Sequence, residues 1–366
     1  MTHNPAAQVR RSLFLHAPVY RKPADALRRM LELVDDGTAP DDPQAALEAR
    51  LATLLGKEAA LLFPTGTMAQ QVALRLHAEA RGRLTFAAHP QTHLDSWEMQ
   101  GYAAVHGLRL QRAGDRHELM TLADLAAVAE PTAAVVWELP QRDLGGLLPE
   151  WDDLRAQIDL VRSRGAAAHL DGARLWEAQT YYRRPHHEIA GLFDSVYVSL
   201  YKSLHGLAGG VLLGDADFIA AAGVWLTRLG GRAGDKWPQA LTALAGLDRL
   251  LPQMDAFRDH AVAIAAAVNA DGVAYVHPDP PQTPLFHVHL PAGRQAVERA
   301  GAEMVAEHGV QLFARLRTSP DPRRSSFEVT VGENTMEFAP DEVAALIREL
   351  VERATVSSPA GPARPA

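Results

Sequence analysis

The sequence predicts an α/β protein: a large domain with a mostly parallel sheet covered by helices, followed by a smaller α+β C-terminal domain. Up to about residue 250, nearly continuous apolar runs alternate with helical stretches, which is typical of strands buried on both faces. Beyond that point the alternation changes. A chain of 366 residues also exceeds what one hydrophobic core usually supports, so two lobes are expected.

Five apolar runs of strand length are expected to form the large sheet: AALLFP (59–64), AAVVWEL (133–139), AAAHLD (166–171), DSVYVSL (194–200) and GGVLLG (209–214). Helical patterns lie between them at 43–56, 68–82 and 148–165. The first stops at Gly56 and the third at Gly165, which suits the left-handed residue that ends many helices.

The C-terminal part has a different order of elements. It predicts a helix at 251–269, the strand FHVHL, a helix at 294–308, the strand SFEVTV and a last helix at 339–353. We therefore expect an N-terminal segment (1–40), a large domain (41–250), a small domain (251–355) and a disordered, proline-rich tail (356–366).

Composition and charge exclude several partners and chemistries. Lysine plus arginine number 36 and aspartate plus glutamate 44, and the net charge of −8 argues against nucleic acid or an anionic membrane as main partner. There is no cysteine, so disulfides and thiolate sites are excluded. No apolar window has the length of a membrane span or a signal peptide, and a cytoplasmic location is expected.

The first candidate site is the turn Phe63-Pro64-Thr65-Gly66-Thr67, which ends a predicted strand and opens a predicted helix. Gly66 allows a tight turn, and the amides of a helix N-terminus favour an anion such as phosphate, with the Thr67 hydroxyl as a further donor. A plain strand-to-helix turn with a threonine cap is the alternative.

The second candidate site is the segment HLDGAR at 169–174. The preceding strand would deliver Asp171 to the carboxyl edge of the sheet, where ligands bind in α/β folds. A carboxylate there can pair with a protonated pyridine nitrogen, and Arg174 can reach an anionic group of the same ligand. A buried structural pair between Asp171 and Arg174 is the alternative.

The third candidate is Lys202, which follows the apolar strand 194–200 and precedes a glycine-bearing loop. Burial at a strand end lowers the pKa of a lysine, and the neutral amine is a nucleophile toward an aldehyde. Most lysines are only solvated surface charges. His93, in THLDSWE, could stack on a planar ring or relay a proton, although one of 16 histidines is weak support by itself.

These motifs, in this order, resemble the low-specificity threonine aldolase and β-eliminating lyase family of fold-type I enzymes, which use pyridoxal 5′-phosphate (PLP). The resemblance covers about residues 40–245 and rests on GKEAALLFPTGTMA (56–69), HLDGARLWEA (169–178) and DSVYVSLYKSL (194–204). It implies a fold-type I PLP-dependent transferase-like fold, an amino acid substrate, and a homodimer or homotetramer.

The resemblance implies a cofactor role for each matching residue. Gly66 and Thr67 would bind the cofactor phosphate, and His93 would stack on the pyridine ring and take part in catalysis. Asp171 would pair with the pyridine nitrogen. Lys202 would hold PLP as a Schiff base and serve as the catalytic lysine.

The substrate side departs from the family. Arg174 would contact a cofactor oxygen or the substrate carboxylate, and Arg228 matches a basic position near the active site of a neighbouring subunit. The family histidine that helps to deprotonate the substrate β-hydroxyl is Gln141 here, and an amide is no base at neutral pH. The family arginine for the substrate carboxylate matches Phe327, and Tyr201 replaces a small hydroxyl residue.

Two further points stay open at this stage. The loop DDGTAPDDPQ (35–44) lacks the tyrosine that the family carries there. Any of four arginines could replace the missing carboxylate ligand: Arg315, Arg317, Arg323 and Arg324.

The leading hypothesis is an aldolase-type lyase that cleaves a β-hydroxy-α-amino acid to glycine and an aldehyde, with threonine itself a poor substrate. A β-eliminating lyase or an aminotransferase on the same scaffold is the second hypothesis, and a PLP-binding protein with little turnover is the third. A nucleotide-binding enzyme is not supported, because no G-x-G-x-x-G follows a strand. No metal site is expected, since His186-His187-Glu188 lacks HEXXH spacing.

Overall fold

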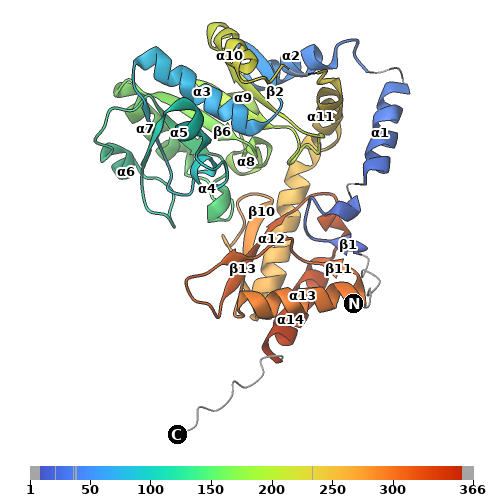
Figure 1. Ribbon diagram of the computed structural model, residues 1–366. Coiled ribbons are helices and arrows are strands. Elements are labelled where there is room, and N and C mark those ends of the chain that lie inside the picture. Colours follow the sequence, from blue (N-terminus) through green and yellow to red (C-terminus); the bar gives the residue numbers. More distant parts are fainter. Residues whose placement is uncertain (1–8, 21, 36, 38, 233, 357–366) are drawn as a thin grey trace. The chain divides into compact units, whose positions relative to one another are not determined.

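The computed structural model describes residues 9–20, 22–35, 37, 39–232 and 234–356 (Figure 1). The described chain divides into two compact units. One spans Leu27–Met254, and the other joins the N-terminal residues up to Ala26 to the chain from Asp255 onward. Except for Val356, the tail at 356–366 that we expected to be disordered lies outside the described residues.

The Leu27–Met254 unit is built on a seven-stranded sheet, which confirms the α/β fold class. In spatial order the strands are β2 (Ala59–Phe63), β8 (Gly210–Gly214), β7 (Ser195–Ser199), β6 (Ala167–Gly172), β5 (Ala134–Glu138), β3 (Thr85–Ala88) and β4 (Arg109–Arg112). The pairings from β7 to β4 are parallel, and β8 is antiparallel to both of its neighbours. All five predicted strands are present, while β3 and β4 have no such apolar run.

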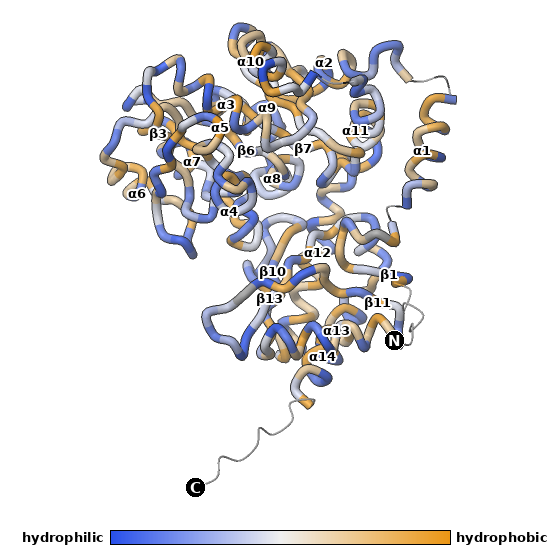
Figure 2. The backbone as a smooth tube through the Cα atoms, in the orientation of Figure 1, coloured by the Kyte–Doolittle hydropathy of each residue, from blue (hydrophilic) through white to orange (hydrophobic). Residues whose placement is uncertain are grey.

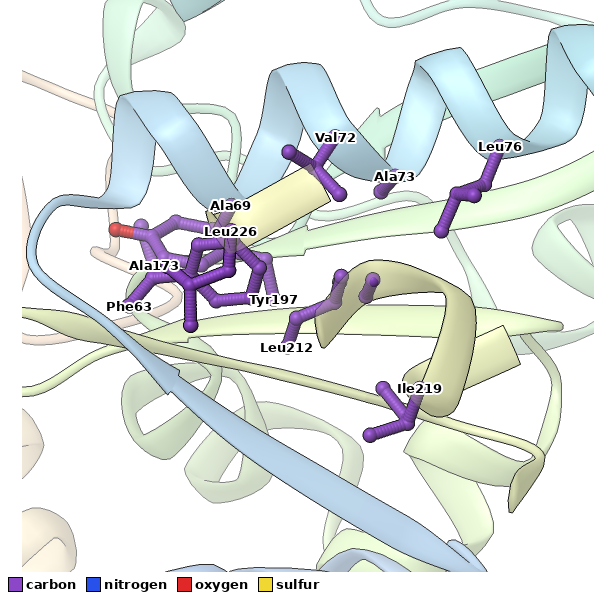
Figure 3. Close-up of a cluster of buried hydrophobic side chains, with 11 residues drawn as sticks. Phe63, Ala69, Val72, Ala73, Leu76, Ala173, Tyr197, Leu212, Ile219 and Leu226 are labelled. Atoms are coloured by element: carbon purple, nitrogen blue, oxygen red, sulfur yellow. The ribbon is translucent and has the colours of Figure 1, made fainter. Parts of the chain in front are cut away.

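The sheet is covered on both faces. Every residue of β6, β7 and β8 is buried, and neighbouring side chains of a strand point to opposite faces. Helix α3 (Gly66–Arg81) packs on several strands, α10 (Ala216–Arg228) packs on α3 and β8, and α7 (Trp151–Ser163) packs on β6. Figure 3 shows the core beneath α3, where Ala69 and Val72 of the helix face Tyr197 and Leu212 of the sheet.

The predicted helices form, and local chemistry sets their ends. Helix α2 (Pro43–Leu55) starts after Asp42, whose side chain accepts a hydrogen bond from the Ala45 amide, and it ends at Gly56 with a φ of 62°. Helix α3 starts two residues earlier than predicted, because Thr65 caps it by accepting from the Met68 amide at 3.2 Å. The candidate phosphate turn is therefore a capped helix N-terminus.

The remaining helices of this unit are short or follow the sheet strands. They are α4 (His93–Ser96), α5 (Gly101–His106), α6 (Leu122–Ala126), the 3-10 turn Arg142–Leu144, α8 (Leu175–Tyr182), α9 (His186–Gly191), α11 (Trp237–Arg249) and the 3-10 turn Leu251–Gln253.

The second unit is α+β, as predicted. Its antiparallel sheet has the order β12 (Arg317–Thr318), β13 (Ser325–Thr330), β10 (Leu285–Leu290), β9 (Tyr275–His277). Its helices are the 3-10 turn Pro18–Tyr20, α12 (Met254–Asp271), α13 (Arg294–His308), the 3-10 turn Thr335–Glu337 and α14 (Pro340–Val356). Strand β1 (Arg11–Ser12) pairs with β11 (Val310–Gln311), so the first described residues belong to this unit.

Helix α1 (Pro23–Asp35) presents apolar side chains to its surroundings. None of its residues is buried, and Leu27 and Leu31 are 63% and 60% exposed. Figure 2 shows the hydrophobic segments along this helix. Such an exposed apolar stripe is typical of a surface that meets another protein. Across the described part of the chain, no helix combines the length and the apolar character that crossing a membrane requires.

Candidate active site

A cavity of about 330 Å³ lies within the Leu27–Met254 unit, in the size range of small-molecule sites. It opens where β6 and β7 end, at the edge of the sheet where α/β folds bind ligands. Its lining comes from five segments of the chain: Pro64–Thr67 with Gln70, His93 with Glu98, Asp171, Tyr197–Lys202 in part, and Leu207–Gly209. Five of the predicted cofactor residues line this one cavity: Gly66, Thr67, His93, Asp171 and Lys202.

The start of α3 forms one wall of the cavity. Thr65, Gly66 and Thr67 all line it, and the first amides of a helix have no partner within the helix. Gly66 is needed here for space, because a Cβ at this position would overlap the hydroxyl group of Tyr197. An unhindered helix N-terminus of this kind binds phosphate without a basic side chain.

Asp171 lies at the end of β6 with both carboxylate oxygens bonded. Oδ1 accepts from the Ala173 amide at 3.0 Å, and Oδ2 accepts from the Gln70 side chain. Burial raises the pKa of Asp171, while the nearby Lys202 ammonium opposes that rise. A buried carboxylate beside the cavity is a partner for a protonated ring nitrogen.

Arg174 forms an ion pair with Glu177, whereas the sequence suggested a structural pair with Asp171 as the alternative to ligand binding. Its Nη1 contacts Oε1 of Glu177 at 3.3 Å, and both side chains are buried. The same oxygen accepts a hydrogen bond from Ser203, the neighbour of Lys202, at 2.6 Å. Glu177 thus links the arginine to the segment that carries the lysine.

Lys202 follows β7 and reaches the cavity. Burial lowers the pKa of its ammonium group, and the positive charge of Arg174 lowers it further, against the opposing effect of Asp171. This lowered pKa increases the fraction of the neutral amine, which is the nucleophilic form.

His93 begins α4 and is held at two points. Its backbone amide donates to Oε1 of Glu138 at 2.5 Å, and its Nδ1 lies 3.0 Å from Oε1 of Glu98. The Glu98 side chain is only 2% exposed, so it is a fixed partner for the ring. With Nδ1 engaged in this way, Nε2 is the ring atom left for a ligand.

Gln141 is buried and its amide is oriented by Glu138. Nε2 of Gln141 donates to Oε2 of Glu138 at 3.1 Å. Burial, together with the adjacent Asp171, raises the pKa of Glu138 well above its usual range. Position 141 thus carries a hydrogen-bonded amide, where the family that this sequence resembles has a histidine.

Two residues on the predicted substrate side lie elsewhere in the fold. Arg228, at the end of α10, is exposed and stacks on Trp225 with 4.9 Å from its guanidinium carbon to the ring centroid. It does not line the cavity described above. Phe327 belongs to the second unit, where it is fully buried opposite Val288 of β10.

Several residues around the cavity were not predicted as site residues from the sequence. Gln70, Glu98, Glu138 and Tyr197 all line it or bond to residues that do. Gln70 lies one turn after Gly66 on α3, a spacing that places the two on the same face of the helix. That spacing was the one usable hint.

The lining suits PLP in each of its parts. The cavity offers one group for each part of PLP. A helix N-terminus can bind the phosphate, a carboxylate can pair with the ring nitrogen, an imidazole can stack on the ring, and an amine can react with the aldehyde. Glycine at position 66 lets the Tyr197 hydroxyl group approach the start of α3, where any side chain would overlap it. This set of groups matches the chemistry of the cofactor.

The comparison with protein families agrees with this donor set. The family described as beta-eliminating lyase matches residues 23–292, well over half of the chain. This chain belongs to the β-eliminating lyase family. As a member, it is an enzyme of a family of PLP-dependent carbon–carbon lyases.

Relatives with known names and structures cover most of the chain. The low-specificity L-threonine aldolase 1 of Arabidopsis thaliana is 26% identical over 318 residues, which span 83% of this chain and 88% of the relative. A Listeria monocytogenes EGD-E structure, provisionally assigned as an L-allo-threonine aldolase, has a TM-score of 0.87 at 31% identity, over 95% of this chain and 97% of that one.

A second structure gives the same result. It comes from Exiguobacterium sp. 255-15 and is provisionally assigned as an aromatic amino acid β-eliminating lyase/threonine aldolase. Its TM-score is 0.86 at 31% identity, over 95% of this chain and 98% of that one. These similarities confirm the predicted fold-type I architecture.

Proposed function

We propose that this β-eliminating lyase family member binds PLP at Lys202 and cleaves a β-hydroxy-α-amino acid to glycine and an aldehyde. The observation that carries the proposal is the single cavity shared by Lys202, Asp171, His93 and the N-terminus of α3. The threonine aldolases among the relatives support the reaction type.

Each cavity residue has a place in holding the cofactor. Gly66 and Thr67 would bind the phosphate through the first amides of α3. Asp171 would pair with the pyridine nitrogen, and His93 would stack on the ring. When bound, PLP supplies an electron sink for negative charge at the substrate Cα.

Lys202 would carry the cofactor and move protons at Cα. The lowered pKa of its amine favours attack on an aldehyde, and the same amine is a base once the substrate has displaced it. Arg174 is close enough to influence Lys202 and would contact a cofactor oxygen or the substrate carboxylate.

The substrate β-hydroxyl proton needs an acceptor other than Gln141. The amide of Gln141 would contact the β-hydroxyl group but cannot remove its proton. His93 has the required chemistry, because Glu98 engages its Nδ1 and so favours a proton-accepting Nε2. In this scheme His93 holds the proton that leaves the β-oxygen.

The test is aldehyde release by the purified PLP-loaded protein from threonine, allo-threonine and phenylserine. Release from at least one of them, lowered at least about a hundredfold in Lys202→Ala, is the expected result. The absence of aldehyde from all three would overturn the proposed reaction.

The second candidate function is β-elimination or amino transfer on an amino acid, and it is favoured because Gln141 has an amide where aldol cleavage would use a base. β-Elimination would yield pyruvate and ammonia from β-substituted alanines, and amino transfer would require a keto acid. Either product in the absence of aldehyde would establish it. PLP absorbance that no amino acid alters would instead indicate a binding protein with little turnover.

We also propose a homodimer or homotetramer in which Arg228 serves a neighbouring subunit. The assembly is supported by the exposed leucines of α1 and by Arg228, which is exposed and does not line the cavity described in its own chain. Light scattering coupled to size-exclusion chromatography tests it, and a monomer would contradict it. The cytoplasmic location stays a prediction.

A further inference from the structure

A continuous chain of buried hydrogen bonds ends on Asp171, and Gln70 is its one member besides Asp171 among the cavity-lining residues described above. Gln70 of α3 donates to Oδ2 of Asp171, and its Oε1 lies 2.7 Å from Nε2 of His169 on β6. Nδ1 of His169 lies 2.7 Å from the hydroxyl of Ser195 on β7. That hydroxyl lies 2.7 Å from Nε2 of His77, back on α3.

The carboxylate end sets the direction of the first two bonds. An ionised carboxylate only accepts hydrogen bonds, so the group of Gln70 that faces Asp171 is its NH₂ group. The amide oxygen of Gln70 then faces His169 and must accept. His169 therefore carries its proton on Nε2, which leaves Nδ1 as an acceptor.

The bonds at the His77 end of the chain have the same donor-to-acceptor direction. Ser195 donates its single proton to His169 and can therefore only accept from His77, whose proton lies on Nε2. Nδ1 of His77 is then an acceptor, and Nη1 of Arg81, which can only donate, lies 3.5 Å from it. One arrangement of protons thus satisfies all the bonds from Arg81 to Gln70.

Burial keeps both imidazoles neutral, as this arrangement requires. It lowers the pKa of His77 to about 3 and that of His169 to about 3. At neutral pH each ring therefore carries one proton, and each acts once as donor and once as acceptor. The four side chains behind Asp171 are all buried, so water does not compete for these bonds.

We propose that Gln70, His169, Ser195 and His77 form a positioning chain that holds the Asp171 carboxylate ionised and aimed at the ring nitrogen of the bound cofactor. The inference rests on the proposed function, because it requires PLP in the cavity. Asp171 needs such support, since Glu138 occupies the position beside it in the β5–β6 register and both carboxyl groups are buried. Glu138 also accepts two hydrogen bonds, from the His93 amide and from Gln141, so the fixed donor from Gln70 is needed to favour the ionised form of Asp171.

Gln70→Met tests the chain, because methionine keeps the length of the side chain and removes both hydrogen-bonding groups. The matched control is Gln157→Met. Gln157 is also a buried glutamine of this unit, and it bonds Trp137 and the carbonyl oxygen of Met120, outside the chain. Both variants lose a buried amide, and only one of the two amides leads to Asp171.

The measurement is the dissociation constant of the apoprotein for two probes: PLP, and 1-deaza-PLP, in which a CH group replaces the ring nitrogen. We expect Gln70→Met to bind PLP about tenfold more weakly, as for other residues that orient a ligand-binding group from behind. Its affinity for 1-deaza-PLP should match that of the wild type, because that probe makes no bond from the ring position to Asp171. Gln157→Met should bind both probes as the wild type does.

Ser195→Ala is the second variant, and it breaks the chain at a residue that does not line the cavity. It adds no volume, so it keeps the experiment decisive where Gln70→Met fails to fold. A smaller loss confined to PLP is expected. Equal losses for the two probes, or no loss for PLP, would overturn the positioning role. If the wild type bound neither probe, the proposed function would fail and this inference with it.

Discussion

Replacing Gly66 with alanine should weaken both the fold and cofactor binding, because the added methyl group has no space. A Cβ at this position would overlap the hydroxyl oxygen and Cζ of Tyr197 and lie 2.9 Å from its Cε2. Carbon atoms in contact settle at about 3.5–4.0 Å. The Tyr197 ring is 4% exposed within the core that Figure 3 shows, so it cannot move aside into solvent.

Overpacking of this kind costs about 1–3 kcal/mol. That range corresponds to roughly a 5- to 150-fold change in the folding equilibrium. The clash also displaces the first turn of α3, so we expect PLP affinity to fall about tenfold, since each 1.4 kcal/mol lost from binding is a factor of ten. Urea denaturation of the apoprotein and PLP titration measure the two effects separately.

Two further variants make the result decisive. Gly191, within α9, has nothing within 4 Å of an added Cβ, so Gly191→Ala should stabilise the protein by up to about 1 kcal/mol. Tyr197→Phe combined with Gly66→Ala should recover only part of the loss, because Cζ still clashes when the hydroxyl is gone. A Gly66→Ala protein with wild-type stability and PLP affinity would refute the reasoning.

Three other changes give equally direct outcomes. Lys202→Ala should abolish the covalent attachment of PLP that borohydride reduction fixes and mass spectrometry detects. It should also lower aldehyde release at least about a hundredfold. PLP still attached at the same site would contradict the assignment of Lys202 as the cofactor lysine. His77 and His169 have pKa values near 3 in the fold against an ordinary 6.5, so the unfolded chain binds protons first on acidification and stability falls from pH 6.5 toward 3. Denaturation at a series of pH values should show the free energy of unfolding falling by up to about 1.4 kcal/mol per pH unit for each ring. His77→Gln should reduce this slope, and an unchanged slope would show that the His77 ring does not contribute to it. Gln141→His should raise aldehyde release from β-hydroxy amino acids by about tenfold or more, since a positioned base is worth that much, and no gain in kcat would show that another group already removes the proton.

The fold was predictable where its signals are local. Of the five strands that the apolar runs predict, four are central and largely buried and β2 lies at the edge of the sheet, while glycines such as Gly56 and Gly82 end the helices in left-handed conformations. Strand β4 has the sequence RLQR at the edge of the sheet, where half-exposed residues leave no apolar run to detect. Strand β1 is two residues long and pairs with β11 across nearly the whole chain, a contact with no local signature.

The proposed cofactor residues that line the cavity could be predicted because each lies at or shortly after the end of a strand within a recognisable motif. Gln70 and His77 were not, because they read as the polar side of a helix until α3 is placed on the sheet. Ser195 and His169 likewise look like ordinary strand residues and gain their meaning from adjacent strands. Glu138 lies beside Asp171 only through the β5–β6 register, which depends on tertiary structure.

The choice between reactions depends on two buried carboxylates and on the hydrogen bonds that each receives. Asp171 accepts from Gln70, and the charge of Lys202 lowers its pKa against the effect of burial, so in the proposed reaction Asp171 would be the carboxylate that pairs with the ring nitrogen. Glu138, with its raised pKa, instead orients the amide of Gln141 through Nε2. In the proposed reaction the oxygen of Gln141 would accept from a substrate hydroxyl, so position 141 would bind a β-hydroxy group without deprotonating it. In the proposed reaction, carbon–carbon cleavage would therefore depend on the pairing of His93 with Glu98, and a substrate whose β-oxygen does not reach that ring should undergo chemistry at Cα alone.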